Sequence, residues 1–472
     1  MPKKWNIVFI TSDEHNAKMV GYDGYPDIKT PALDRLAKEG MALGRAYAAF
    51  PLCSPARQSI YTGLYPQEHG QVGNGIIFPQ RNETWAHHFK RAGYKTAIIG
   101  KTHDNNTEYQ LGFDLCMRND VEINLKDSAA SNDAKLSPGR VTDEKDALLY
   151  KSSPDRRFSG QVLSKPTDES DGVVIEESLK YLREHKDEKF FLHVSMTKPH
   201  WPWNAPKEYY YMYDPERIAF EPVRPDAFDD NPVPRARFFG SRWNELTEEQ
   251  NRLYRARYYG SLSWMDSNIG LVLDELDTLG LSDHTLVMYT SDHGDMAGEK
   301  GLWLKGLMYE GSARIPAVIR MPGVIPQGSR ADTLFNQVDI YPTLAGLTGS
   351  AELLPDTLSG VDLSAALLGK KDGPEYTYSV EGADLEGKAR QTMVRSKRYK
   401  FCWYPNEEKQ YVLYDMEKDP EETKNIAYEP ASKETVETHL QEAKRFLESR
   451  RLFPYEVTRL NRKSQAFIKE KE

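Results

Sequence analysis

Cysteine is scarce in this sequence: a chain of 472 residues contains only Cys53, Cys116 and Cys402. An odd and sparse set excludes a disulfide framework of the kind that holds small secreted proteins together, and it is compatible with a reducing compartment. Scarcity does not exclude chemistry at a single thiol, so each cysteine needs its own interpretation. Cys116 and Cys402 carry no motif around them, and we expect both to pack as small apolar residues.

Long apolar runs are also missing. No stretch approaches the ~18 residues that a membrane-spanning helix needs. The first apolar run, residues 6–10, follows Met1-Pro2-Lys3-Lys4 directly and is shorter than the ~7–15 residues of a signal-peptide core. We therefore expect no membrane contact and a cytoplasmic protein, or a periplasmic or secreted one if a signal peptide has been removed.

A surplus of basic residues is absent as well: 62 Lys and Arg stand against 71 Asp and Glu, for a net charge of −9. A general nucleic-acid binder usually shows the opposite balance, so nucleic acid is excluded as a partner. Hydrophobic residues make up 39% and aromatic residues 11%, which is enough for a large core and excludes disordered and collagen-like classes. At ~150 residues per domain, the length predicts about three domains, or one large domain with an appendage.

Short apolar runs alternate with helical patterns over the first 370 residues. The predicted strands are 6–10, 96–100, 190–196, 285–290 and 315–320, and the predicted helices are 31–39, 84–92, 172–185, 247–279 (broken in places) and 338–347. This alternation predicts an α/β fold with a large, mostly parallel (mixed) sheet sandwiched by helices.

The pattern changes after residue 370. Short strands at 376–380, 391–395, 398–403 and 410–415, followed by a helix at 433–450, predict a smaller C-terminal α+β domain with an antiparallel sheet. We expect a catalytic domain at 1–370, with an irregular insertion at 118–171, and a C-terminal subdomain at 371–472. The tail 452–472 mixes charges with large apolar residues, so a homo-oligomer and docking on the chain's own surface both stay open.

Reactive side chains follow four of the predicted strands. Strand 6–10 leads to Asp13 and Glu14, and strand 285–290 leads to Asp292 and His293. The two strands between them lead to Lys101 and His103 and to His200. Because ligands bind at the carboxyl ends of parallel strands, we expect these groups to meet at one edge of the sheet.

Two roles separate by charge. Asp13, Glu14, Asp292 and His293 suit a divalent cation, since clustered carboxylates repel one another without a positive partner. The remaining groups suit an anion held against the metal, and they are Arg57, Lys101, His103, His200 and Lys305. A metal facing a cationic cradle favours hydrolysis of a phosphate or sulfate ester.

Cys53 is the candidate nucleophile. Pro55 fits the first turn of a helix that ends before Gly63, and Arg57 lies one turn on. A thiolate is favoured at such a helix N-terminus. The alternative is an inert buried cysteine.

Cys53-Ser54-Pro55-Ala56-Arg57 resembles the C-x-P-x-R signature of the type I, formylglycine-dependent sulfatases of the alkaline phosphatase superfamily. Further blocks resemble the family in the same order and extend over nearly the whole chain. They are Gly100-Lys101-Thr102-His103, Lys198-Pro199-His200, Ser291 to Asp295, Gly301 to Gly306, Arg314-Ile315-Pro316 and Leu413-Tyr414-Asp415.

The resemblance implies an alkaline-phosphatase-like fold and a mechanism. A formylglycine-generating maturation enzyme would convert Cys53 to Cα-formylglycine, whose hydrate would attack the sulfur of a small sulfated substrate, a carbohydrate or another organic sulfate. It also implies roles for the matching residues. Asp13, Glu14, Asp292, His293 and the modified Cys53 would bind the metal; Arg57, Lys101, His103, His200 and Lys305 would be catalytic, with Lys101, His200 and Lys305 contacting sulfate.

Two departures from the family pattern bear on the metal and the substrate. Glu14 stands where many sulfatases have a second aspartate, and His293 stands where many have asparagine. The Asp292-His293 pair resembles the phosphonate monoesterase and choline sulfatase branches instead. We expect calcium, with manganese or magnesium as alternatives, and a phosphonate monoester hydrolase or phosphodiesterase as the alternative activity. Trp201 and Asn105 are candidate contacts for the leaving group.

Overall fold

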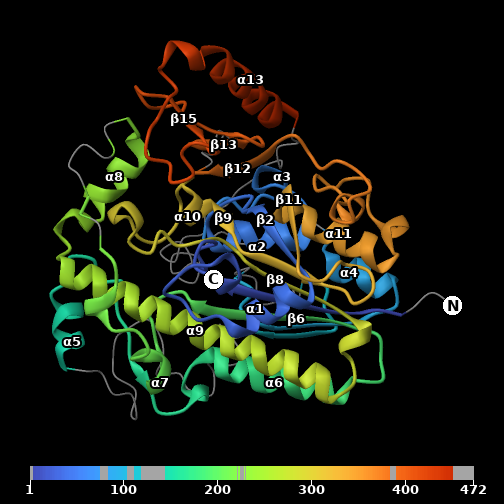
Figure 1. Ribbon diagram of the computed structural model, residues 1–472. Helices are drawn as coiled ribbons and strands as arrows, with labels where there is room; N and C mark the ends of the chain where they lie inside the picture. The colour runs from blue at the N-terminus through green and yellow to red at the C-terminus, as the bar shows by residue number, and fades with distance from the viewer. Residues whose placement is uncertain are drawn as a thin grey trace, which may run out of the picture.

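A mixed nine-stranded sheet forms the centre of the computed structural model, which describes residues 4–74, 83–103, 111–118, 144–220, 222–223, 228, 230–382 and 390–449. The strand order is β11-β2-β10-β8-β1-β6-β3-β4, and β9 pairs with β2 (Figure 1). Their bounds are β1 Asn6–Asp13, β2 Met41–Tyr47, β3 Lys95–Gly100, β4 Leu115–Arg118, β6 Phe190–Pro199, β8 Thr285–Ser291, β9 Arg314–Ile315, β10 Ala317–Arg320 and β11 Ser329–Asn336.

The middle of this sheet is parallel. Strands β8, β1, β6, β3 and β4 all run in one direction, whereas β10 is antiparallel to both β8 and β2. The carboxyl ends of the parallel strands therefore share one edge, as the sequence predicts. The mostly parallel, mixed sheet is confirmed.

Helices cover both faces of the sheet. Alternation along β1 sends Val8 and Ile10 to one face and Ile7 and Phe9 to the other, where they join separate apolar cores. The first face packs against α1 (Pro31–Glu39), α6 (Ser170–Glu184) and α9 (Glu248–Thr278); the second packs against α2 (Cys53–Thr62), α4 (Trp85–Arg91) and α11 (Gln337–Thr348) (Figure 1).

The expected break within residues 247–279 is wrong. Helix α9 is continuous over 31 residues. Gly260, which weakens the helical pattern in the sequence, lies where a Cβ would come within 2.3 Å of the Tyr209 carbonyl oxygen. The glycine thus permits close packing of α9 on a neighbouring segment and does not interrupt it.

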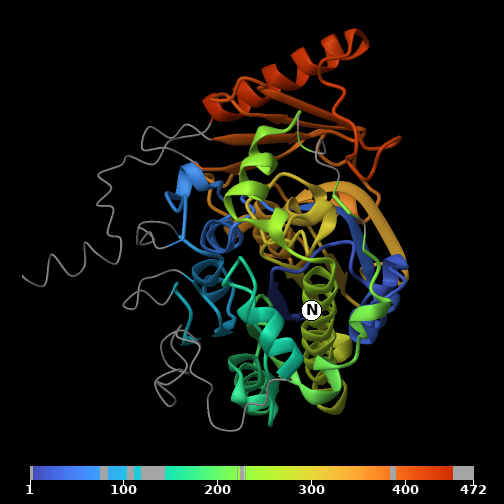
Figure 2. The same cartoon turned by 90° about the vertical axis from the view of Figure 1, so that its left-hand side faces the viewer.

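A four-stranded antiparallel sheet forms the C-terminal part, in the order β12 (Thr377–Glu381), β13 (Gln391–Arg395), β14 (Tyr399–Trp403) and β15 (Tyr411–Asp415). Helix α13 (Lys433–Ser449) lies on its outer face, as Figure 2 shows, and buries Leu440 and Ala443 against Val394, Phe401 and Leu413. The predicted C-terminal α+β unit is confirmed, and a domain boundary near residue 370 stays a prediction.

Part of the stretch 118–171 is regular, although we expected an irregular insertion. Residues 119–143 lie outside the described residues, but α5 (Glu144–Lys151) follows them, and its Asp146 pairs with Arg257 Nε of α9 at 2.7 Å.

No helix among the described residues has the length and apolar character to cross a membrane. The other short elements are α3 Pro66–His69, β5 Val162–Leu163, β7 Ala205–Pro206, α7 Lys207–Tyr210, α8 Pro232–Gly240, α10 Glu310–Ala313 and α12 Ser364–Leu367.

Candidate active site

Four strand ends bring the predicted reactive groups together at the carboxyl edge of the sheet. Asp13 is the last residue of β1, and Asp292 directly follows the neighbouring strand β8. On the other side of β1, strand β6 leads to His200, and beyond it β3 leads to Lys101. These positions follow from the parallel order of the strands.

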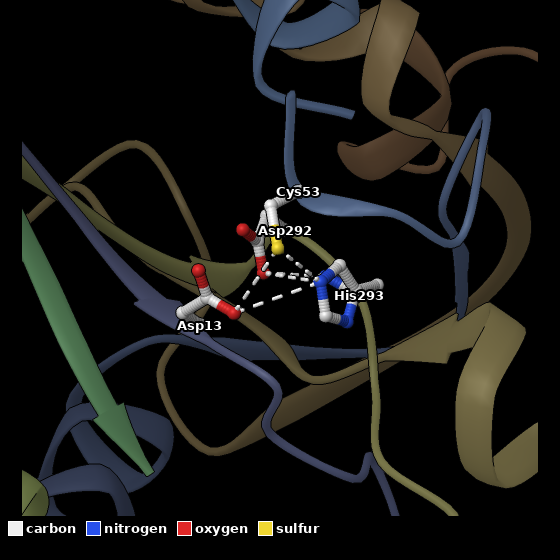
Figure 3. Close-up of side chains that lie close together, drawn as sticks. All are labelled: Asp13, Cys53, Asp292 and His293. Atoms are coloured by element: carbon white, nitrogen blue, oxygen red, sulfur yellow. Dashed lines mark hydrogen bonds and ion pairs between the residues drawn. The ribbon is translucent and has the colours of Figure 1, made fainter. Parts of the chain in front are cut away.

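Asp13, Cys53, Asp292 and His293 form a compact buried cluster (Figure 3). His293 Nε2 lies 3.6 Å from both Asp13 Oδ1 and Asp292 Oδ1. The Cys53 sulfur is 3.2 Å from the same nitrogen and 3.7 Å from Asp13 Oδ1. His293 Nδ1 is 2.9 Å from the Gly294 carbonyl oxygen, which can only accept a hydrogen bond. Burial opposes the charge of His293, but Asp292 and Cys53 outweigh it and raise its pKa to about 9, so the ring is protonated when no metal is bound. A bound metal would displace the Nε2 proton, and the ring would then donate through Nδ1 and turn its Nε2 lone pair into the cluster.

Arg57 holds the outer oxygens of the two aspartates. Its Nε donates to Asp292 Oδ2 at 2.9 Å, and its Nη2 lies 3.4 Å from Asp13 Oδ2. Nη1 donates to the Lys101 carbonyl oxygen at 2.9 Å and to Ser195 Oγ at 2.7 Å. The guanidinium thus leaves the inner Oδ1 atoms of both aspartates facing the centre of the cluster.

Glu14 adds a third carboxylate from a strained backbone position, with a φ of 73°. Tyr258 of α9 steadies this turn, since its hydroxyl donates to the Glu14 carbonyl at 2.7 Å and accepts from the Asn16 amide at 3.0 Å. Glu14 Oε1 is 2.8 Å from Lys305 Nζ. Among the described residues, none donates a hydrogen bond to the buried Glu14 Oε2.

This donor set fits a divalent cation. Burial raises the pKa of Glu14 to about 8, against the opposing charge of Lys305. Burial and the charge of Asp13 raise the pKa of Asp292 to about 6. Burial thus opposes ionisation of Glu14 and Asp292, and Glu14 Oε2 accepts no hydrogen bond from the described residues. A metal ion bound to these carboxylates would stabilise their charged forms. Asp13, Asp292 and His293 lie in one group with Cys53, whereas Glu14 lies in a second group with Asp13 and His200. Carboxylate oxygens with one imidazole suit calcium, manganese or magnesium.

The cationic side chains lie nearer to solvent than the carboxylates. The side chains of Lys101, His200 and Lys305 are 12%, 16% and 13% exposed, whereas those of Asp13 and Glu14 are 0% exposed. We call these three residues the mouth of the site; Lys101 and Lys305 carry its positive charge. An anion that enters from solvent meets positive charge before it reaches the carboxylates.

Lys305 and His200 differ in their protonation state. Burial opposes the charge of Lys305, but Cys53, Glu14 and Asp13 outweigh it and raise its pKa. Burial and the charge of Lys305 lower the pKa of His200 to about 4. In the free protein near neutral pH, Lys305 therefore carries a proton to donate and His200 offers a neutral ring.

Cys53 occupies the first position of helix α2, as predicted. The preceding Leu52 is extended, and Gly63 ends the helix in the left-handed region with a φ of 66°. Although burial opposes ionisation, Lys305, Lys101 and His293 hold the pKa of the Cys53 thiol well below its usual range. His103, with a φ of 54°, also hydrogen-bonds this sulfur. The position stabilises negative charge.

The predicted leaving-group contacts are only partly described. Trp201 is half-buried, and its ring centroid lies 5.1 Å from that of His200. Asn105 lies outside the described residues. Cys116 and Cys402 are buried in separate apolar cores, consistent with packing.

Sequence reasoning missed three polar residues that hold the site. Ser195 accepts from Arg57 and donates to the Lys101 carbonyl at 2.6 Å. Tyr258 fixes the Glu14 turn, and Gln337 contacts the backbone of Asp292. None lies in a reactive motif. A polar residue in the mostly apolar strand β6 was a signal for Ser195, whereas Tyr258 stands among the many polar residues of α9 and gave none.

Comparison with known proteins agrees with this geometry. The family model described as Sulfatase matches residues 5–350, and one described as N-sulphoglucosamine sulphohydrolase, C-terminal, matches residues 298–450. An arylsulfatase of Clostridium perfringens is 32% identical over 456 residues, with 92% of each chain covered. A choline-sulfatase of Rhizobium meliloti is 31% identical and covers 90% of this chain and 83% of its own.

Solved structures support the fold. A phosphonate monoester hydrolase of Agrobacterium radiobacter superposes with a TM-score of 0.77 at 24% identity, covering 94% of this chain and 95% of the other. The match of the family model over 5–350, with a relative 32% identical across 92% of the chain, shows that this protein belongs to the sulfatase family of the alkaline phosphatase superfamily, whose enzymes hydrolyse sulfate esters.

Proposed function

We propose that this chain hydrolyses the sulfate ester of a carbohydrate or another small organic alcohol, with formylglycine made from Cys53 as the nucleophile, and releases inorganic sulfate. The observation that carries the proposal is the place of Cys53. Its sulfur belongs to the cluster with Asp13, Asp292 and His293, and the charges of Lys305 and Lys101 act on it at the N-terminus of α2. A nucleophile there adjoins both a metal site and an anion site.

Asp13, Glu14, Asp292 and His293 would hold the divalent cation, with calcium as our first choice because three of the four donors are carboxylates. Manganese and magnesium are the alternatives, since His293 widens the choice. A cation held there supplies positive charge that neutralises the carboxylates and attracts the anionic substrate.

The chain's own residues do the remaining work. Arg57 binds the outer oxygens of Asp13 and Asp292, which leaves their inner oxygens free to hold the metal. Lys101, His200 and Lys305 would bind the sulfate oxygens, and one of His200 and Lys305, which both lie beside Glu14, would pass a proton to the leaving oxygen. His103 steadies the side chain at position 53, and Trp201 would line the leaving-group side.

A formylglycine-generating maturation enzyme is the partner that this proposal requires. The test begins with the protein produced together with such an enzyme, followed by mass spectrometry of the peptide that contains residue 53. We expect the aldehyde in the wild type. A peptide that remains fully a free thiol in that host, in a protein that is nevertheless active, would contradict the nucleophile.

Substrate class is tested by comparing kcat/KM for 4-nitrophenyl sulfate and bis(4-nitrophenyl) phosphate. We expect the sulfate to be the better substrate, and far higher efficiency on the diester would favour the phosphonate monoester hydrolase or phosphodiesterase alternative. A panel of sulfated mono- and disaccharides, with choline sulfate included because a relative carries that name, then identifies the natural class.

A further inference from the structure

We propose that Gln337 is a positioning residue of the reaction centre, whose side-chain amide ties the segment that carries Cys53 to the loop that carries Asp292 and His293. The inference rests on the proposed function, because it assumes that these three side chains must keep their mutual distances during the reaction. Gln337 itself touches neither the nucleophile nor a side chain of the cluster.

The amide of Gln337 joins two distant parts of the chain. Its Oε1 accepts a hydrogen bond from the Ala49 amide at 3.1 Å. Its Nε2 donates to the Asp292 carbonyl at 2.6 Å and to the Ser291 carbonyl at 3.2 Å. Gln337 is 0% exposed, so water does not compete for these bonds. Both ends of the amide are therefore in use, one on each segment.

The backbone of Gln337 is itself held in place. It is the first residue of α11, and Asn336 caps that helix by accepting from the Val338 amide at 3.3 Å. Asp339 Oδ2 accepts from the Asn336 amide at 2.9 Å, which completes a capping box. In β11, Asn336 is also in register with Tyr47 of β2. The glutamine side chain therefore starts from a fixed point.

Sheet pairing alone does not set the distance that Gln337 spans. Asp292 follows β8, and Cys53 follows β2, but the antiparallel strand β10 lies between these two strands. The segment 48–52 then leaves the sheet before α2 begins. A side chain that bonds to Ala49 and to Asp292 at once fixes this approach directly. Residues that hydrogen-bond to metal ligands without binding the metal themselves orient those ligands.

A loss of stability alone does not distinguish a positioning residue from a structural one, because replacing any buried amide leaves its hydrogen-bond partners unsatisfied and destabilises the protein. The experiment therefore needs a control residue. Gln250 of α9 provides the matched control. It is 3% exposed, its Oε1 accepts from the Thr247 amide at 3.0 Å, and its Nε2 donates to the Leu149 carbonyl and to Ser152 Oγ, both at 3.2 Å. Its bonding pattern resembles that of Gln337, and none of these partners belongs to the site.

The experiment compares Gln337→Met with Gln250→Met in the full chain. Methionine keeps the length of the side chain and removes every hydrogen bond. We measure Tm, kcat and KM on 4-nitrophenyl sulfate, and calorimetric binding of calcium and of manganese to protein that retains the Cys53 thiol. We expect similar losses of Tm in both variants. Only Gln337→Met should lower kcat, by about 10- to 100-fold with KM nearly unchanged, and weaken metal binding by a similar factor.

The proposal would be overturned if Gln337→Met and Gln250→Met had the same kcat and the same metal affinity. If Gln337→Met does not fold, Gln337→Asn answers the same question, because it keeps an amide in the buried space but is one methylene shorter and cannot bond to both segments at once. A wild type that hydrolyses no sulfate ester would defeat the proposed function, and metal binding by the two variants would then still decide the role of Gln337.

Discussion

Replacing Lys400 with methionine should destabilise the joint between the C-terminal sheet and the catalytic sheet. Lys400 of β14 is 0% exposed, and its Nζ lies 3.0 Å from Glu310 Oε1 and 2.7 Å from Glu422 Oε1. Methionine retains the apolar stem but leaves two buried carboxylates facing each other. Removing one member of a buried ion pair costs about 3–5 kcal/mol, and we expect a loss of that size.

The pKa of Glu310 gives an independent magnitude. Burial alone would raise it, but Lys400, with Arg314 and Arg395, outweighs burial and lowers the pKa from 4.5 to about 2. Since a factor of ten in proton affinity is about 1.4 kcal/mol, this depression corresponds to about 3 kcal/mol of stabilisation. Lys400 is the largest of the three cationic contributions. The other partner shifts in the opposite direction, because burial outweighs Lys400 and raises the pKa of Glu422.

The sign of the pH dependence follows from the same values. A depressed carboxyl pKa contributes stability that is fully present above pH 4.5 and is lost as the pH falls towards 2. The wild type should therefore lose stability more steeply than Lys400→Met in that interval.

The assay is urea unfolding at pH 7 and at pH 4, followed by tryptophan fluorescence and by circular dichroism to test whether the transitions coincide. The control combines Lys400→Met with Glu310→Gln and Glu422→Gln. It should recover most of the loss, because neutral groups replace all three charges. A loss below about 1 kcal/mol for Lys400→Met alone would refute the reasoning, since that is the value of an exposed pair.

Three further predictions concern the reaction centre. Cys53→Ala should abolish turnover of 4-nitrophenyl sulfate with little change in Tm, because alanine fits the buried space; remaining activity would remove Cys53 as the nucleophile. Chelation of divalent metal should abolish turnover and lower Tm, and calcium at a hundred times its Kd should restore about 2.7 kcal/mol; a Tm that ignores both treatments would argue against a metal at the carboxylate cluster. Lys305→Ala and His200→Ala should both lower kcat, and the variant that has lost the proton donor should suffer more as the pKa of the leaving alcohol rises; equal sensitivity to the leaving group in both variants would mean that neither residue alone donates the proton.

The sequence by itself determined the sheet class and most of the reactive groups. Alternation of apolar strands and helices implies parallel strands, and parallel strands must end at one edge. Asp13, Lys101, His200 and Asp292 were therefore predictable neighbours, because Asp13 ends its strand and the other three directly follow theirs. The helix start at Cys53 was equally local, since Pro55 and Gly63 mark the two ends of α2.

Only the tertiary structure decided how these groups are held. Ser195, Tyr258 and Gln337 are ordinary polar residues in the sequence, and their partners lie far from them along the chain, as the Ala49 amide does from Gln337. The role of Gly260 within α9 is likewise visible only in the fold, where the Tyr209 carbonyl packs closely against it. The residues at which the strands end are determined by local patterns, which can be recognised in the sequence. The bonds that fix distances between those strand ends depend on packing between distant segments, which a single sequence does not reveal.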